Sequence, residues 1–176
     1  MTPKVIFFLI LSSLPVLAGD WREFFEKKEF PYDGGVLNYR LARLAPQGDD
    51  PLPLVLFLHG KGQRGDDNES QLSYGVGPMV NWVAQNKEAC LVVVPQCPGD
   101  VYWAALEDDY KTPGRVKLRP EPRATLKSVL ALVKSLVERG QADPQRLYIT
   151  GLSMGGYGTF EAIAREPGLF AAAVPI

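Results

Sequence analysis

The stretch from Arg146 to Phe160 constrains the fold of this chain more than any other part of its sequence. It begins with a short apolar run typical of a buried strand, turns through Gly151-Leu152-Ser153-Met154-Gly155, and continues with residues that favour a helix. In such a G-x-S-x-G turn the serine backbone is strained, and the glycines leave room for the neighbouring strand and helix. The pattern predicts that Ser153 stands clear of the sheet as a catalytic nucleophile.

A glycine-rich loop follows a second apolar run. Leu54–Leu58 is continuously apolar, as in a strand buried on both faces of a parallel sheet, and the chain then passes through His59 into the loop 60–65. Glycines at the C-terminal end of a strand let backbone N–H groups come close to a ligand. A phosphate-binding loop is the alternative, but the G-x-x-x-x-G-K-[ST] spacing is missing.

These two loops supply the candidate oxyanion hole. We expect the N–H of Met154, at the start of the helix behind Ser153, to be one donor, because a helix N-terminus favours negative charge. The second donor is expected from the turn Gly60-Lys61-Gly62, with Lys61 as the first choice.

Strands and helices are expected to alternate along the rest of the chain, which indicates an α/β fold with a mostly parallel sheet and helices on both faces. A half-buried antiparallel edge strand is predicted at Leu37–Leu44, after an amphipathic stretch at Asp20–Phe30. A turn is expected at Asp143–Gln145. Helices are predicted at Met79–Asn86 and from Arg123 to Gly140. Buried strands are predicted at Leu91–Pro95 and Phe170–Ile176.

Two irregular segments carry open alternatives. Residues 96–122 form a long excursion in which Tyr102 and Trp103 either line a substrate cleft or cover the core. The acidic residues of Asp66–Glu69 lack the spacing of a calcium loop and are interpreted as a solvated loop or a helix start.

The first 18 residues have the parts of a secretory signal peptide, with Lys4 before a short apolar run and small residues at Val16 and Ala18 before a cut at Gly19. This predicts a secreted or periplasmic protein whose domain begins at Gly19 and which is not stably inserted in a membrane after cleavage. An N-terminal membrane anchor is the alternative. The formal charge of −1 gives no electrostatic basis for binding nucleic acid.

The two cysteines, Cys90 and Cys97, are not expected to pair with each other. The extended residues between them would hold the two thiols too far apart for a disulfide.

Several of these motifs, taken in order, resemble those of secreted α/β-hydrolases. The resemblance is carried by Leu58-His59-Gly60-Lys61-Gly62, by Val94-Pro95-Gln96-Cys97-Pro98 and by the elbow around Ser153. The chain looks most similar to the esterase group of polyhydroxybutyrate depolymerases and feruloyl esterases, with prolyl-oligopeptidase-like hydrolases as relatives. The resemblance implies cleavage of small-molecule or polymer esters through an acyl-serine at Ser153, with no metal and no organic cofactor.

A serine nucleophile needs a histidine base and a carboxylate, which follow the serine in this family. No histidine follows Ser153 in this sequence, and the one histidine, His59, is expected to support the oxyanion loop. Glu161 and Glu166 are interpreted as part of a solvated helix face. We therefore expect the domain to be incomplete at its C-terminus, without its last strands, and the 176 residues alone to be inactive. A peptidase and a non-catalytic protein of the same fold are the alternative functions.

Overall fold

The computed structural model describes residues 20–45, 48–107 and 117–176. The predicted signal peptide, residues 1–18, lies outside this part of the chain. Within it, no helix is both long and apolar enough to cross a bilayer.

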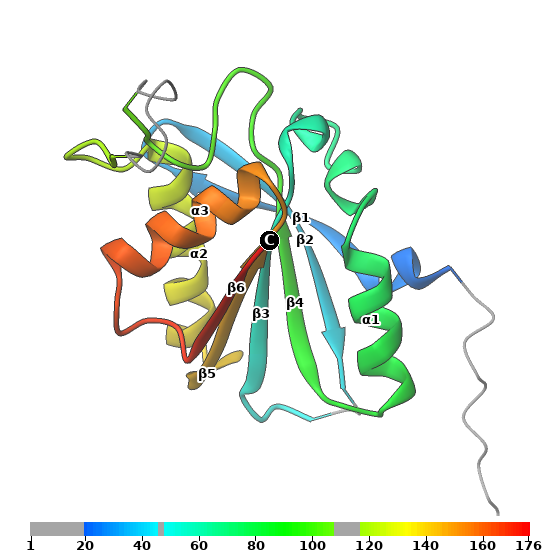
Figure 1. Cartoon of the computed structure of the whole chain (residues 1–176). Helices are drawn as coiled ribbons and strands as arrows, with labels where there is room; N and C mark the ends of the chain where they lie inside the picture. The colour runs from blue at the N-terminus through cyan, green and yellow to red at the C-terminus, as the bar shows by residue number, and fades with distance from the viewer. Residues whose placement is uncertain (1–19, 46–47, 108–116) are drawn as a thin grey trace, which may run out of the picture.

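One six-stranded sheet, with strand order β1-β2-β4-β3-β5-β6, forms the centre of the molecule (Figure 1). Strands β3, β4, β5 and β6 run parallel to one another, and β1 and β2 are antiparallel to their neighbours. The strands are β1 (Phe25–Tyr32), β2 (Gly35–Leu44), β3 (Leu52–Leu58), β4 (Cys90–Pro95), β5 (Ala142–Gly151) and β6 (Ala172–Pro175).

Helices cover both faces of the sheet. Helix α1 (Val76–Gln85) lies on one face, while α2 (Ala124–Glu138) and α3 (Met154–Arg165) lie on the other (Figure 1). Three short 3-10 helices, η1 (Trp21–Phe24), η2 (Lys61–Gln63) and η3 (Ser70–Leu72), occupy connections among the described residues.

Each face has its own apolar core. Val92 and Val94 of β4 pack in the cluster on the α1 side, and Leu91 and Val93 pack in the cluster on the α2 side. Successive strand residues point to opposite faces, so a strand covered on both sides must be apolar throughout. The amphipathic pattern from Arg123 is confirmed, because α2 buries its apolar stripe against the sheet, in contact with β5, β1 and β2, with Leu126, Val129, Val133 and Leu136 fully buried.

The two edges of the sheet differ from the prediction. Leu37–Leu44 was expected to be an edge strand, but β2 pairs with both β1 and β4, and the amphipathic stretch supplies the true edge, β1. Lysines and Pro31 on β1 protect this edge from further pairing. At the other edge, β6 pairs with β5 and is alternately exposed, so the prediction of a buried strand there is wrong for this chain.

The start of β5 differs from the prediction. The sequence predicts a turn at Asp143–Gln145, but these residues belong to β5, at the point where its pairing with β3 shifts register. Cys90 and Cys97 do not pair with each other, as predicted, and both are buried free thiols in this chain. Burial raises the pKa of Cys90 to about 11 and that of Cys97 to about 12, so both thiols stay protonated and unreactive at neutral pH.

Candidate active site

Ser153 lies at the sharp turn between β5 and α3. Its backbone has φ 55° and ψ −111°, a conformation that L-residues rarely adopt and that costs roughly 1–3 kcal/mol. Two hydrogen bonds hold the turn: Leu152 N–H donates to Leu58 O at 3.0 Å, and Ser153 N–H donates to Ile176 O at 2.6 Å. The turn is therefore tied to the end of β3 on one side and to the end of β6 on the other.

The flanking glycines are required by close backbone packing. A Cβ at Gly151 would lie 2.3 Å from Gly155 O, and a Cβ at Gly155 would lie 1.9 Å from Leu58 O. No side chain fits at either position, which is the steric reason that the G-x-S-x-G spacing suggested.

The loop after β3 lies next to Ser153. A methyl group added at Gly60 would lie 3.9 Å from Ser153 Cβ, so the loop passes close to the nucleophile turn. Lys61 and Met154 are the first residues of η2 and α3 and have no intrahelical acceptor for their N–H groups. No other acceptor for either N–H occurs among the described residues. Gly62 follows within η2 and faces open space.

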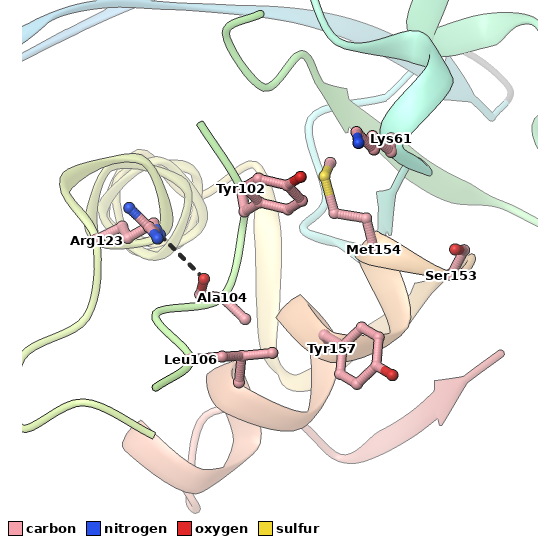
Figure 2. A pocket seen from close by; sticks show the side chains of 8 residues that line it. All are labelled: Lys61, Tyr102, Ala104, Leu106, Arg123, Ser153, Met154 and Tyr157. Atoms are coloured by element: carbon pink, nitrogen blue, oxygen red, sulfur yellow. Dashed lines mark hydrogen bonds between the residues drawn. The ribbon is translucent and has the colours of Figure 1, made fainter. Parts of the chain in front are cut away.

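A cavity of about 280 Å³ opens beside the nucleophile (Figure 2). It brings together Ser153, Met154 and Lys61, the three residues expected to form the nucleophile and the oxyanion donors. Its other lining residues are Tyr102, Ala104, Leu106, Arg123 and Tyr157. The sequence suggested only Tyr102 among these; Arg123 was assigned simply to the start of a helix.

His59 is fully engaged in holding the loop. Its Nε2 accepts a hydrogen bond from Cys97 N–H at 2.9 Å, and its Nδ1 lies 2.6 Å from Gly60 O, so the hydrogen-bond network places the ring proton on Nδ1. Burial lowers the pKa of His59 to about 4, which keeps the ring neutral. Neither ring nitrogen is available to Ser153, and the arrangement agrees with the supporting role expected for this histidine.

The described residues of the irregular segment, 96–107 and 117–122, contribute both to the cavity and to the core. Tyr102 is 37% exposed and lines the cavity, whereas Trp103 is completely buried and donates from Nε1 to His59 O at 3.0 Å. Tyr102 therefore lines the cavity, and Trp103 covers the core.

Glu161 corrects the sequence interpretation. It was assigned to a solvated face but is 0% exposed, because the excursion folds over α3. Its Oε2 accepts from Ala105 N–H at 2.6 Å, and its Oε1 accepts from Arg165 Nη2 at 3.0 Å. Arg165 in turn donates to the carbonyl oxygens of Arg119 and Pro120. This pair fastens both sides of the excursion to α3. Glu166 is partly exposed and pairs with Lys134 at 2.8 Å.

The acidic stretch after the oxyanion loop has a structural role. Asp67 Oδ1 accepts from the N–H groups of Glu69 and Ser70 at 2.8 and 2.9 Å, which starts η3, in keeping with the expected helix start. The hydroxyl and N–H of Ser70 lower the pKa of Asp67 well below its usual range. Gln96 donates to Asp67 Oδ1 at 2.7 Å and accepts from Asn68 N–H at 2.7 Å, so it connects this loop to the end of β4.

Comparison with known proteins places these features in context. Residues 119–176 match the model of the prolyl oligopeptidase family. A crystal structure described as a thermostable esterase superposes with a TM-score of 0.71 at 39% identity, covering 87% of this chain and 40% of that one. NocK of Nocardia uniformis subsp. tsuyamanensis, provisionally named an esterase, is 30% identical over 127 residues, which are 72% of this chain and 33% of NocK. A ferulic acid esterase structure has a TM-score of 0.59 at 16% identity, over 85% of this chain and 56% of that one.

These similarities establish the α/β-hydrolase fold and support an esterase-like hydrolase. The chain spans about a third of NocK and 40% of the thermostable esterase. The ferulic acid esterase is too distant in sequence to bear on more than the fold.

Proposed function

We propose that Ser153 is the nucleophile of a carboxylic ester hydrolase that acts through an acyl-serine intermediate. The observation that carries this proposal is the strained, positive-φ serine at the edge of a cavity, with two unpaired backbone N–H groups beside it. Strain of this kind persists where the surrounding structure and the function both require it.

In the proposed reaction, Ser153 Oγ attacks the ester carbonyl as a base removes its proton. The carbonyl oxygen becomes negatively charged and would be stabilised by the N–H groups of Met154 and Lys61, within the turn Gly60–Gly62. The N-terminus of α3 adds positive potential at the same place. Expulsion of the alcohol leaves the acyl group on Ser153, and water then releases the acid.

His59 is not free to act as the base. His59 is the only histidine of the sequence, and both of its ring nitrogens are already bonded. We propose that a carboxylate and a histidine following Ile176 complete the site. Two observations support this: the relatives are longer, and Ile176 O already contacts Ser153 N–H. The 176 residues by themselves should then hydrolyse esters slowly or not at all.

Ester hydrolysis is favoured over peptide hydrolysis by the 39% identity to a structure described as an esterase. The match of residues 119–176 to the prolyl oligopeptidase family keeps a peptidase as the second candidate. A secreted or periplasmic location, from the signal sequence, remains part of the proposal.

The test compares aryl acetates with peptide anilides as substrates for the full-length gene product. We expect ester hydrolysis to dominate and Ser153→Ala to lower kcat by on the order of a thousandfold or more. Ser73→Ala removes an exposed serine outside the cavity and should leave the rate unchanged. Ester hydrolysis that survives Ser153→Ala would rule out the proposal, and a folded protein inactive on both substrate types would favour a non-catalytic role.

A further inference from the structure

Positive charge is concentrated at the cavity beside Ser153. Lys61 and Arg123 line the cavity, and Arg64 lies behind its Tyr102 wall. In the part of the chain that the structure describes, none of these three cations has a carboxylate within ion-pair distance. We propose that the ester substrate carries a carboxylate, which Arg123 binds away from the scissile bond. This inference rests on the proposed function and names its substrate class.

Arg123 is held in place with part of its guanidinium free. Its Nε donates to Ala104 O at 3.0 Å, and the side chain is only partly exposed. The two Nη nitrogens have no hydrogen-bond partner among the described residues. An oriented guanidinium with free N–H groups suits a carboxylate, which can accept two parallel hydrogen bonds from it.

The side chains of Lys61 and Arg64 both lie against the Tyr102 ring. The Arg64 guanidinium lies 5.0 Å and the Lys61 ammonium 5.8 Å from the centre of its ring. Arg64 also donates to Val101 O at 3.0 Å and to Lys61 O at 3.2 Å, which ties the oxyanion loop to the excursion. Contact with an aromatic ring stabilises a cation without neutralising its charge.

Many of the other described cations are paired. Carboxylate partners within ion-pair distance are found for Arg22, Lys27, Lys28, Arg40, Lys127, Lys134, Arg146 and Arg165. The like charges at the cavity repel one another, and an anion bound in the cavity would reduce this repulsion.

The arrangement of the lining indicates the shape of the substrate. Figure 2 shows Ser153 and Arg123 at opposite ends of the cavity lining. Between them lie Tyr102, Met154 and Tyr157. The structure therefore favours an ester at one end, a short apolar or aromatic spacer, and a carboxylate at the other end. A volume of about 280 Å³ is at the small end of ligand sites, so a compact substrate fits better than a long chain.

The experiment uses two aryl acetates of the same size, para-acetoxybenzoate and para-acetoxybenzamide, with the full-length gene product. The ratio of their kcat/KM values measures the preference for the carboxylate. We expect wild type to prefer the benzoate and Arg123→Gln to reduce the ratio about fivefold or more, as for loss of a partly exposed charged hydrogen bond. Arg123→Lys keeps the charge but not the planar pair of N–H donors, so it should retain only part of the preference, and added salt should weaken the preference.

Arg139→Gln is the matched control. It removes an arginine from the opposite end of α2, well away from the cavity, and should leave the ratio at its wild-type value. A ratio that is unchanged in Arg123→Gln, with hydrolysis still dependent on Ser153, would overturn the inference and leave the proposed function intact.

Binding provides a readout that does not require catalysis. If neither ester is hydrolysed, the proposed function fails, and calorimetric titration with para-hydroxybenzoate and para-hydroxybenzamide decides the inference separately. Binding of the benzoate that is lost in Arg123→Gln supports a carboxylate site. Equal binding of the two compounds, or no binding of either, contradicts it.

Discussion

Among single residues, His59 illustrates how hydrogen bonds and burial together determine a chemical role. Its ring connects Gly60 of the oxyanion loop to Cys97 after β4, and Trp103 packs edge-on against it with ring centres 5.2 Å apart. The sequence placed a histidine beside the nucleophile loop but could not show that both ring nitrogens are used. That information depends on where Cys97 N–H lies after folding.

The first prediction concerns the effect of pH on stability through His59. Its pKa of about 4 in the folded state lies below the ordinary value of 6.5, so the unfolded chain takes up a proton more readily than the folded one. The stability contributed by the neutral ring is present above about pH 6.5 and is lost as the pH falls towards 4. The free energy of unfolding decreases by about 3 kcal/mol in total over this range.

Urea unfolding at about pH 7 and pH 4.5 measures this effect. Wild type should lose about 2–3 kcal/mol more between these two pH values than His59→Gln, whose side chain does not titrate. The carboxylates titrate in both proteins, so their contribution to the loss of stability cancels when the two proteins are compared. Equal losses in the two proteins would show that His59 is accessible to protons in the folded state.

At the scale of elements, the interaction between α3 and the excursion shapes the cavity. Ala104 and Leu106 line it, and Ala105 between them is held by Glu161. We expect Glu161→Ala to release this segment and to increase hydrogen exchange at the Ala105 amide about tenfold or more, because the amide loses a charged acceptor.

Glu161→Gln retains an acceptor oxygen and should keep most of the protection at Ala105. Glu166→Ala, directly after the end of α3 and in a partly exposed pair with Lys134, is the control and should leave that amide unchanged. Unaltered exchange in Glu161→Ala would mean that Glu161 does not hold the cavity wall.

The elements themselves could largely be predicted from local sequence. The apolar stripe of α2 and the continuous apolar runs of β3 and β4 identify buried segments without reference to distant residues. Glu161 could not be placed, because helical spacing does not reveal that residues far earlier in the chain cover that turn of α3. The inner position of β2 likewise depends on its long-range pairing with β4.

For the whole molecule, the two sheet edges have different consequences. β1 is protected by its lysines and Pro31, but β6 exposes Val174 and has β5 as its one partner strand in the described chain. An unprotected strand edge can pair with a second molecule. We expect the 176-residue chain to self-associate reversibly with increasing concentration.

Val174→Lys should shift this association to higher concentrations, since Val174 is 59% exposed and a charge there opposes edge pairing. Lys27→Val on β1 is the reciprocal change and should promote association. Sedimentation velocity over a range of concentrations gives the measurement. A chain that stays monomeric throughout would show that β6 is not an active edge.

Taken as a whole, the molecule places Ser153, the free N–H groups of Lys61 and Met154, and a cationic cavity at one end of the parallel strands. Sequence motifs predicted the nucleophile and the loop beside it, because glycine spacing reflects local backbone packing. They could not predict Arg123 and Tyr157 in the cavity, since these residues reach it from α2 and α3 only after the layers assemble.

The most direct test of the central claim is to locate the covalent adduct formed by a fluorophosphonate on the full-length gene product. Tryptic digestion and mass spectrometry identify the modified residue. We predict a single adduct on Ser153, no adduct in Ser153→Ala, and little or none on the 176-residue chain, which has no free histidine base. An adduct on another serine, or an unmodified Ser153 in a protein that still hydrolyses esters, would contradict the account.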